Sequence, residues 1–457
     1  MDITLRMSDH ALTARAAAAA GIVLLKNTAG TLPLLPAEDG APLPVAIFGI
    51  RQLLTPAYDR AMTPWRAIGV LDGLMASDAV RPDGLLARKY RTWAMEHPDG
   101  SELPLTNVDF GALRHDCAAA VVVIGRTPEQ DHTRLTSEET AMLTRVTSVF
   151  DRTILVLAAP GFIELNEAAL ACGAIVFLGL AGQEAGGALA DVLTAKVMPS
   201  GHLSFSWPEH AEAFSDASAA ADQFTGYRYF DSFGAELRWP FGYGLSYTKF
   251  TYSNLTLSGD TVFVTVKNTG SIAGAEGGQL YVEAPQNSLH RPVRELKGFQ
   301  KLFLQPNESR EAVFRLTDRS FAVWQDGWKI PVGQYTVSIG GLTAPVIKHG
   351  ETLPVPAWQR GSWYQSCTGK PNKKDWEAML GREYIPPVLK KGAFTMDNTV
   401  MEMKGYSLIM KIMYKAVEAT IAKGFGGKKD YKNPEFRMMM NASAGAPLRS
   451  MQISGGI

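Results

Sequence analysis

Short apolar runs, each bounded by glycine, proline or polar residues, recur along the first 210 residues of the chain. They are four or five residues long and rich in Val, Ile and Leu, as are strands that are buried on both faces of a sheet. The strands predicted in this way are Ile22–Leu25, Val45–Phe48, Val121–Ile124, Ile154–Ala158 and Ala174–Leu178. Small and apolar groups from Ala11 onward follow helical spacing, so the chain is expected to open as a helix followed by a strand.

Longer stretches that mix polar and apolar residues separate these runs. Ser137–Phe150 and Glu184–Thr194 are each long enough for a helix that crosses from one strand to the next. An alternation of strand and helix is typical of α/β domains, because parallel neighbours need such crossover connections. The first part of the chain is therefore predicted to be an α/β domain with a mostly parallel sheet.

A different pattern begins at Phe250. Apolar residues now alternate with polar ones, as in the sets Val262, Val264 and Val266, then Ala312, Phe314 and Leu316, then Tyr335, Val337 and Ile339. Strict alternation indicates strands with one face in a core and one face in water. Turn sequences such as Asn-Thr-Gly and Pro-Val-Gly separate these short strands, which predicts an antiparallel β-sandwich.

The chain beyond residue 346 is rich in Pro, Lys and Gly, and one amphipathic stretch interrupts it. A helix is predicted over residues 406–422, with one apolar face made of Leu408, Ile409, Ile412, Met413, Ala416, Val417 and Ile421. Lys411, Lys415 and Glu418 exclude a membrane span for this helix.

Charge sets limits on the partners of the chain. The 457 residues contain 45 Lys and Arg and 45 Asp and Glu, so the formal net charge is zero. There is no general electrostatic reason to expect nucleic acid or an anionic membrane as a partner. A neutral substrate fits this balance better.

Cysteine usage and the N-terminal sequence bear on the cellular compartment. Cys117, Cys172 and Cys367 are widely spaced and show neither paired metal-ligand spacing nor a disulfide framework. Charged residues from Asp2 to Arg15 precede the first alanine run, so no basic start is followed by the apolar region of a secretory signal. Free thiols and a cytoplasmic location are therefore expected.

Several motifs in the first 250 residues, taken in order, resemble the region that follows the barrel in family 3 glycoside hydrolases, the β-glucosidase-like family. Residues 16–34, with the core Ile-Val-Leu-Leu-Lys-Asn and a later Leu-Pro-Leu, resemble the start of that region. Gly182–Gly187, Ala190–Leu193 and Pro199–Gly201 resemble a second motif. The most specific pair is Gly226–Asp231 followed by Pro240–Tyr247, which is similar to the family's exit from the α/β domain.

The later part of the chain is similar to the fibronectin type III-like module that accompanies this α/β domain. The similarity rests on Asn268–Gly270, Gln279–Val282 and Arg291–Phe299. Parts of the last hundred residues resemble a tail that follows the module in some members. The expected domains are an α/β sandwich over residues 1–248, a fibronectin-III-like β-sandwich over 249–345 and a partly helical tail over 346–457.

The glycines and aromatic residues of these motifs can also be interpreted from their physical properties alone, without reference to the family. Gly186 and Gly187 are predicted to let the start of a helix lie close to a strand, since they carry no Cβ. Tyr227, Tyr229, Phe241 and Tyr243 are expected to serve core or interdomain packing rather than stacking on sugar, because aromatic clusters usually bury area.

Candidate chemistry follows from the resemblance. Retaining glycosidases use two carboxyl groups roughly 5–5.5 Å apart, one as nucleophile and one as acid and base. In the family the nucleophilic Asp lies in the barrel, and the acid/base Glu comes from a loop of the α/β domain after a strand like Val121–Gly125. Glu129 lies in the corresponding loop and is the candidate general acid/base. Its neighbours Asp131, His132 and Arg134 are candidates for binding the sugar or tuning the pKa of the carboxyl group.

Two departures from the family pattern keep an alternative open for these residues. The loop at Glu129 is shorter than in typical members, with Gln130 and His132 in place of the expected residues. The stretch Ile50–Asp59 replaces a Gly- and Ser-rich loop, so it is not expected to approach a sugar. Asp375-Trp376 matches the family's nucleophile motif only by coincidence, because it follows two lysines in a polar tail. Glu129 and Asp131 can equally be solvated loop carboxylates.

The catalytic barrel has no counterpart in this pattern. An eight-stranded barrel needs about 250 residues of repeating strand and helix, and the tail is too short to supply it. No phosphate-binding glycine loop, nucleophile elbow or histidine-rich metal cluster is present in the sequence, so no cofactor or metal is expected. The sequence predicts part of a β-glucosidase-like enzyme that acts on a β-linked glycoside with a separate barrel polypeptide as partner. The alternatives are a non-catalytic carbohydrate-binding or assembly module and an inactive fragment.

Overall fold

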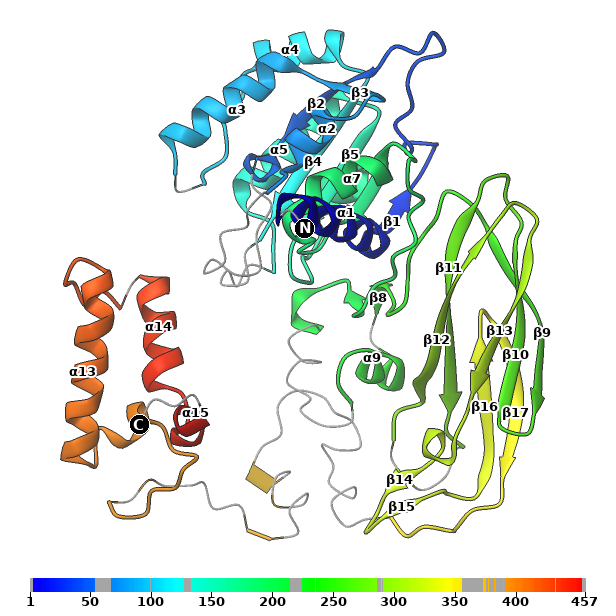
Figure 1. Cartoon of the computed structure of the whole chain (residues 1–457), viewed down its shortest axis with the longest axis vertical. Coiled ribbons are helices and arrows are strands. Elements are labelled where there is room, and N and C mark those ends of the chain that lie inside the picture. The colour runs from blue at the N-terminus through cyan, green and yellow to red at the C-terminus, as the bar shows by residue number, and fades with distance from the viewer. Residues whose placement is uncertain are drawn as a thin grey trace. The chain divides into compact units, whose positions relative to one another are not determined.

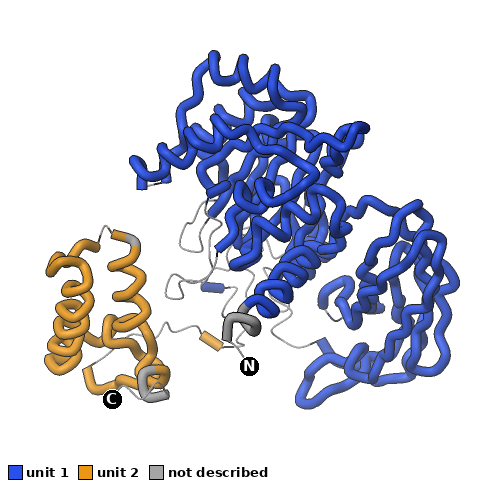
Figure 2. The backbone as a smooth tube through the Cα atoms, turned by 45° about the horizontal axis from the view of Figure 1, so that its top comes forward, with its two compact units in different colours: residues 1–379 blue, residues 380–457 orange. Residues whose placement is uncertain are grey.

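A computed structural model gives the fold of the chain and describes residues 3–53, 67–98, 100–126, 133–213, 224–234, 236–285, 289, 291–355, 373–374, 377, 382–383, 389, 391–431 and 433–453. The residues fall into two compact units, 1–379 and 380–457 (Figure 2). The first unit contains an α/β part and a β-sandwich, and the second is helical (Figure 1). The predicted fold classes are confirmed. The predicted domain limits at residues 248 and 345 stay predictions.

The α/β part is built on a six-stranded sheet in the order β1-β6-β5-β4-β2-β3. Strands β2 to β6 are parallel to their neighbours, and β1 alone pairs antiparallel, with β6. The mostly parallel sheet was predicted from the apolar runs, and each run lies within one strand or overlaps it. The strands are β1 (Val23–Asn27), β2 (Leu43–Phe48), β3 (Val80–Pro82), β4 (Ala119–Gly125), β5 (Thr153–Ala158) and β6 (Ala174–Phe177).

Helices cover both faces of this sheet and bury alternate residues of each strand. In β4, Ala120, Val122 and Ile124 belong to one apolar core, whereas Val121 and Val123 belong to the other. The first core is completed by α3 (Gly84–Glu96), α4 (Asn107–Asp116), α5 (Ser137–Val149) and α6 (Glu167–Ala171). The second is completed by α1 (Ile3–Gly21), α2 (Val70–Met75) and α7 (Ala185–Leu193). Burial on both faces explains why the strands read as continuous apolar runs.

The glycines of the second motif serve a helix contact. A Cβ on Gly186 would overlap the carbonyl of Gly69 at the start of α2, and one on Gly73 would overlap the carbonyl of Gly186. Helices α2 and α7 therefore cross with their backbones in contact. The predicted close approach is present, but its partner is a helix and not a strand, because the short α2 lies between this face of the sheet and the solvent.

Aromatic residues join the α/β part to the sandwich. Helix α9 (Tyr227–Phe233) lies in the chain between the paired strands β7 (Trp207–Pro208) and β8 (Leu237–Trp239), and its Tyr227 stacks on Phe241 with ring centroids 4.6 Å apart. Its hydroxyl accepts a hydrogen bond from the Leu296 backbone N–H at 2.8 Å, and Arg294 forms an ion pair with Asp231 at 2.7 Å. The expected packing role is confirmed for Tyr227 and Phe241.

The sandwich consists of a three-stranded and a four-stranded antiparallel sheet, in the orders β13-β10-β9 and β12-β11-β16-β17. All nine alternating residues named in the sequence analysis are buried in its core. The strands are β9 (Phe250–Ser258), β10 (Thr261–Asn268), β11 (Gly274–Glu283), β12 (Arg294–Leu304), β13 (Ser309–Arg315), β16 (Gly333–Ile339) and β17 (Leu342–Lys348), with a small hairpin of β14 (Val323–Trp324) and β15 (Trp328–Lys329).

The second unit contains four helices among its described residues: α12 (Val400–Met403), α13 (Leu408–Gly424), α14 (Pro434–Ala444) and α15 (Leu448–Ile453). The predicted helix over 406–422 corresponds to α13, and Ser407 caps its start. The predicted apolar face is buried only in part. Ile421 packs against Phe436 and Met440 of α14, whereas Leu408, Ile409 and Ile412 are exposed.

No helix among the described residues is both long enough and apolar enough to cross a membrane.

Candidate functional site

The carboxyl ends of the parallel strands β2 and β4 open into a polar cavity. Ligands of open α/β sheets commonly bind at this edge, where loops leave the strands. The cavity has a volume of about 400 Å³. Two arginines and three glutamates are among the residues that line it: Ile50, Arg51, Gly100, Ser101, Glu102, Val123, Gly125, Arg126, Thr136, Glu138, Glu139 and Met142.

Glu102 fixes the chain that leaves β2. Its carboxylate accepts hydrogen bonds from the backbone N–H of Ile50 at 2.9 Å, the hydroxyl of Tyr90 at 2.9 Å and the backbone N–H of Leu103 at 3.1 Å. Tyr90 is fully buried, and its hydroxyl also accepts from the Gly49 N–H. Burial raises the pKa of Glu102, although the three donors act in the opposite direction. The carboxyl group thus holds its proton more tightly than an exposed glutamate does.

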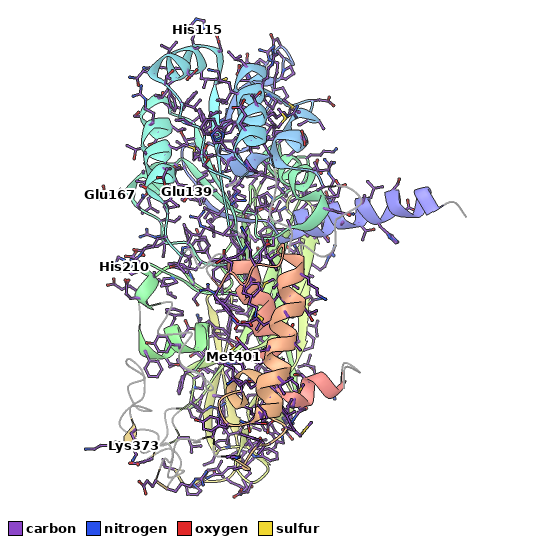
Figure 3. All side chains as sticks on the ribbon, turned by 90° about the vertical axis from the view of Figure 1, so that its left-hand side faces the viewer. His115, Glu139, Glu167, His210, Lys373 and Met401 are labelled. Atoms are coloured by element: carbon purple, nitrogen blue, oxygen red, sulfur yellow. The ribbon has the colours of Figure 1, made fainter. Side chains whose placement is uncertain are left out.

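Arg126 and Glu139 fix the chain that leaves β4. The guanidinium donates to both carboxylate oxygens of Glu139, at 2.6 and 2.7 Å, and to the carbonyl oxygens of Gly125 and Arg134. Glu139 is also the third residue of α5 and completes a capping box with Thr136. The sequence motifs point to Glu129 in this region and give no sign of the ion pair of Glu139, which is labelled in Figure 3.

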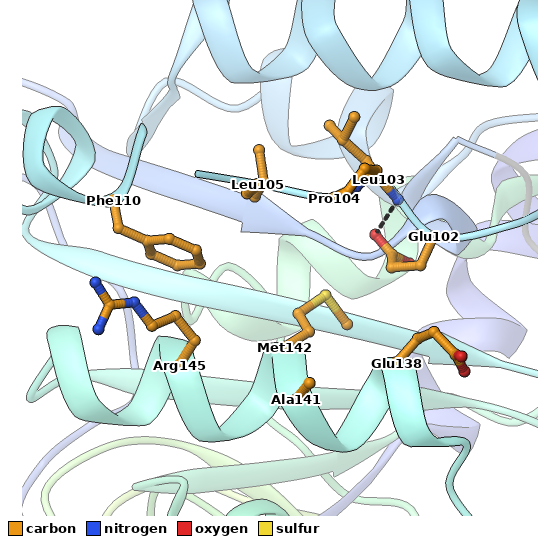
Figure 4. Close-up of a pocket in the computed structure, with 9 residues that line it drawn as sticks. All are labelled: Glu102, Leu103, Pro104, Leu105, Phe110, Glu138, Ala141, Met142 and Arg145. Atoms are coloured by element: carbon orange, nitrogen blue, oxygen red, sulfur yellow. Dashed lines mark hydrogen bonds between the residues drawn. The ribbon is translucent and has the colours of Figure 1, made fainter. Parts of the chain in front are cut away.

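A second, more apolar cavity adjoins the first. Its volume is about 290 Å³, and Glu102, Glu138 and Met142 line both cavities. Leu103, Pro104, Leu105, Phe110, Ala141 and Arg145 complete its lining (Figure 4). Because three residues are shared, a ligand with one polar and one apolar end could occupy both.

Three of the four predicted site residues, Glu129, Asp131 and His132, lie outside the described residues. The structure describes the chain on both sides of their loop. Arg126 is the last described residue after β4, and Thr133 is the first described residue before α5. Both ends are near the cavity, because Arg126 lines it and the Arg134 carbonyl accepts from the same guanidinium. Their roles stay predictions. The stretch 54–59 of the altered first loop and the pair Asp375-Trp376 also lie outside the described residues.

Arg134, the fourth predicted residue, lies in an exposed cluster of charges. Its guanidinium donates to Glu164 at 2.9 Å and also to Glu212. His210, which is labelled in Figure 3, lies 3.5 Å from the other Glu164 oxygen. Burial favours a raised pKa for Glu164, but hydrogen bonds from Arg134, Ala211 and His210 outweigh it and lower the pKa. The described contacts tie Arg134 to the loop after β5, and its substrate-binding role stays a prediction.

No group of three His, Cys, Asp or Glu among the described residues has an arrangement suited to a metal ion.

The fold and its motifs have counterparts among known proteins. Residues 22–247 match the model of the glycosyl hydrolase family 3 C-terminal domain, and residues 276–343 match a fibronectin type III-like domain. The chain carries the C-terminal domain of glycosyl hydrolase family 3. The match includes β4, the cavity and the loop of Glu129.

Relatives of this family 3 chain are β-glucosidases by name. It is 30% identical over 424 residues to the probable β-glucosidase L of Aspergillus fumigatus, covering 78% of this chain and 54% of that protein. The β-glucosidase from Paenibacillus barengoltzii has a TM-score of 0.66 and 30% identity, over 75% of this chain and 43% of that one. β-Glucosidase 3B from Thermotoga neapolitana, solved in complex with glucose, has a TM-score of 0.66 and 29% identity, over 75% and 54%. The chain spans about half the length of the curated relatives it matches.

Proposed function

We propose that this chain supplies the acid/base half of a β-glucosidase-like retaining glycosidase, with Glu129 as general acid/base. The observation that carries the proposal is the polar cavity at the carboxyl edge of β2 and β4, where both ends of the Glu129 loop are anchored. The substrate is proposed to be a neutral β-linked glycoside, in line with the zero net charge and with the β-glucosidase relatives.

The proposed reaction is a double displacement. A carboxylate from a partner attacks the anomeric carbon, while Glu129 donates its proton to the departing glycosidic oxygen as the C–O bond breaks. Glu129 then takes a proton from water, which attacks the anomeric carbon and releases both the sugar and the partner's carboxylate. Asp131 and His132 are proposed to orient the sugar or tune the pKa of Glu129, and Arg134 to do so from the end of the same loop.

The partner is proposed to be a separate polypeptide with a (β/α)₈ barrel that bears the nucleophile. The sheets formed by the described residues have six, three, four, two and two strands, and none of them is an eight-stranded barrel. Neither nucleic acid nor membrane is part of the proposal.

A cytoplasmic location is proposed with this function. Cys117 and Cys172 are both buried and unpaired, and burial raises the pKa of their thiols to about 11 and about 12. Such thiols are poorly reactive, because the thiolate is the nucleophilic form.

Leaving-group dependence tests the role of Glu129. The full chain is co-expressed with the barrel-containing part of a family 3 β-glucosidase from the same organism, and the initial burst of dinitrophenolate release from 2,4-dinitrophenyl β-glucoside is compared with the hydrolysis of cellobiose. Glu129→Gln is expected to reduce cellobiose hydrolysis about 10²–10⁴-fold, the usual contribution of general acid/base catalysis. Formation of the glycosyl intermediate from the dinitrophenyl substrate is expected to fall far less, because that leaving group departs without a proton.

The matched control is Glu138→Gln, since Glu138 lines the same cavity from the start of α5. Equal loss on both substrates, or no loss from Glu129→Gln, would show that Glu129 is not the acid.

A non-catalytic carbohydrate-binding module is the second candidate. The engagement of Arg134 by Glu164 and Glu212 counts against a role of Arg134 in holding the substrate of an enzyme, since a guanidinium held by two carboxylates has fewer donors for a sugar. Titration calorimetry of the full chain with glucose and cellobiose separates the two candidates. Binding without any turnover in the presence of the barrel polypeptide supports the module.

A further inference from the structure

Two tryptophans are exposed on the β14–β15 hairpin, which lies at one end of the sandwich (Figure 1). Trp324 and Trp328 are directly opposite each other in the hairpin, so their side chains share one face. The two residues are 65% and 49% exposed. Indole rings carry a large apolar surface, and aromatic residues exposed together in this way often mark a binding site.

The two rings form a corner. Their centroids are 5.3 Å apart and their planes meet at 69°. The guanidinium of Arg319 lies 3.4 Å from the centroid of the Trp328 ring, and this cation–π contact helps to fix the orientation of the ring. Trp324 has the more exposed ring, and the corner is already formed without a ligand.

The base of the hairpin is firmly attached to the core of the sandwich. Phe321, just before β14, is buried, and the hydroxyl of buried Tyr335 donates to the carbonyls of Phe321 and Pro331 at 3.2 and 2.9 Å. The side-chain amide of Gln325 donates to the Pro354 carbonyl at 3.0 Å. The exposure of the tryptophans is therefore a property of an ordered hairpin and not of a frayed end.

Charges around the hairpin are balanced. Lys329 lies 3.8 Å from Glu351, and Lys348 lies 3.8 Å from Asp318. Within residues 318–329 the remaining charged residues are Arg319 and Asp326, one of each sign, with Asp326 in the turn between the tryptophans. A neutral polar ligand suits this surface better than a phosphate or an acidic peptide, since neither sign of charge dominates.

We propose that the corner of Trp324 and Trp328 is a non-catalytic binding site for β-linked glucan chains. β-Glucopyranose carries its hydroxyl groups equatorially, so both faces of the ring present axial C–H groups that stack on an indole. The equatorial hydroxyl groups then point away from the indole, and the guanidinium of Arg319 beside Trp328 supplies hydrogen-bond donors for them. The choice of a glucan as ligand rests on the proposed function, whereas the corner itself does not.

The indole N–H signals of the full chain test this proposal directly. The chain has nine tryptophans, and ¹⁵N-indole labelling followed by titration with cellohexaose reports on each of them. Signals that disappear in Trp324→Ala and Trp328→Ala identify the two residues. Cellohexaose is expected to shift these two signals most, and Trp324→Ala is expected to weaken binding at least tenfold in calorimetry.

Phe299→Ala is the matched control, because Phe299 is a 78% exposed aromatic residue on β12 of the same sandwich. It is expected to leave the affinity unchanged. Maltohexaose, which has α-linkages and a curved chain, is expected to bind more weakly. The proposal fails if cellohexaose leaves the two signals in place, if Trp324→Ala binds as the wild type does, or if the corner instead captures only proteins.

The result is separable from that for catalysis. Hydrolysis of an aryl β-glucoside by the chain with its barrel partner needs only the active site and is expected to be unchanged in Trp324→Ala. If cellohexaose binds at the corner but the chain with its barrel partner hydrolyses no glucoside, the proposed function is contradicted and the binding site at the corner is supported. Hydrolysis without binding at the corner would do the reverse.

Discussion

Arg126 and Glu139 bring opposite charges into the interior of the α/β part, with side chains that are 6% and 14% exposed. Removing one member of a buried ion pair leaves the other charge without compensation, which costs more than the pair itself contributes. Glutamine at position 139 keeps the capping box, because Glu and Gln both serve at the third position of a helix. The substitution therefore isolates the loss of charge.

Glu139→Gln is expected to lower the free energy of unfolding by roughly 3–5 kcal/mol. Urea denaturation followed by circular dichroism measures this change. The control is Glu138→Gln at the exposed neighbouring position, which is expected to change stability by less than about 0.5 kcal/mol. Equal effects of the two substitutions would contradict the account of the pair.

The pH dependence of stability reports on Glu102. Its pKa in the folded chain is raised above the ordinary value of 4.5 by burial, so the ionised carboxylate disfavours the folded state. This cost is fully present above the raised pKa and disappears as the pH falls through it toward 4.5. Glutamine does not titrate, so the stability of Glu102→Gln relative to the wild type is expected to be higher at pH 7 than at pH 4.5.

Urea denaturation of both proteins at pH 7 and pH 4.5 gives the difference in the free energy of unfolding between variant and wild type at each pH. The contributions of the other titrating groups cancel in this comparison, because both proteins contain them. A difference that does not change with pH would show that the pKa of Glu102 is not raised.

Residues of the candidate site were predictable only where a motif carried them. Glu129 was named from the resemblance of its loop and stays a prediction, whereas nothing near Glu102 in the sequence signals its hydrogen bonds to Ile50 and Tyr90. The partners of Arg134 are 30 and 78 positions away, at Glu164 and Glu212. Such contacts are set by which strand ends the topology brings together, and no local pattern records them.

At the scale of elements, the contact between α2 and α7 depends on glycine. Gly186→Ala places a Cβ against the carbonyl of Gly69, so the helices must move apart. Thermal denaturation is expected to show that the free energy of unfolding falls by about 1–3 kcal/mol, the usual cost of overpacking. Gly111→Ala is the control, because Gly111 lies in helix α4 with open space around it. It is expected to gain about 0.5–1 kcal/mol. A stabilising Gly186→Ala would contradict the contact.

Elements with strong periodicity were predictable and short ones were not. The five apolar runs and the alternating strands of the sandwich were found because burial on one or both faces leaves a clear pattern. The helices α12, α14 and α15 of the second unit were missed, since four to eleven residues rich in Met and polar groups carry a weak signal. The apolar pattern of α13 does not show which of its residues are buried, because these residues extend beyond the side that α14 covers.

At the scale of the whole molecule, the chain has two units with separate cores. Phe436 is fully buried in the helical unit between Ile421, Phe425 and Met440. Phe436→Ala is expected to lower the free energy of unfolding of this unit by about 3–5 kcal/mol, which is comparable to the entire stability of a unit of this size. Limited proteolysis is expected to digest residues beyond 380 while residues 1–379 remain intact with an unchanged melting temperature. Met439→Ala, at an exposed position, is the control. A lowered melting temperature of the first unit would show that the two units unfold together.

The central claim is that this chain contributes one of the two carboxyl groups of a glycosidase and depends on a barrel polypeptide for the other. The most direct measurement is the turnover of 4-nitrophenyl β-glucoside by the purified 457-residue chain, alone and after mixing with the barrel polypeptide. The account predicts that the chain alone does not turn over this substrate and that the mixture does. Glu129→Gln is expected to abolish the turnover by the mixture. Turnover by the purified chain alone, or an active mixture that is indifferent to Glu129→Gln, would contradict the account.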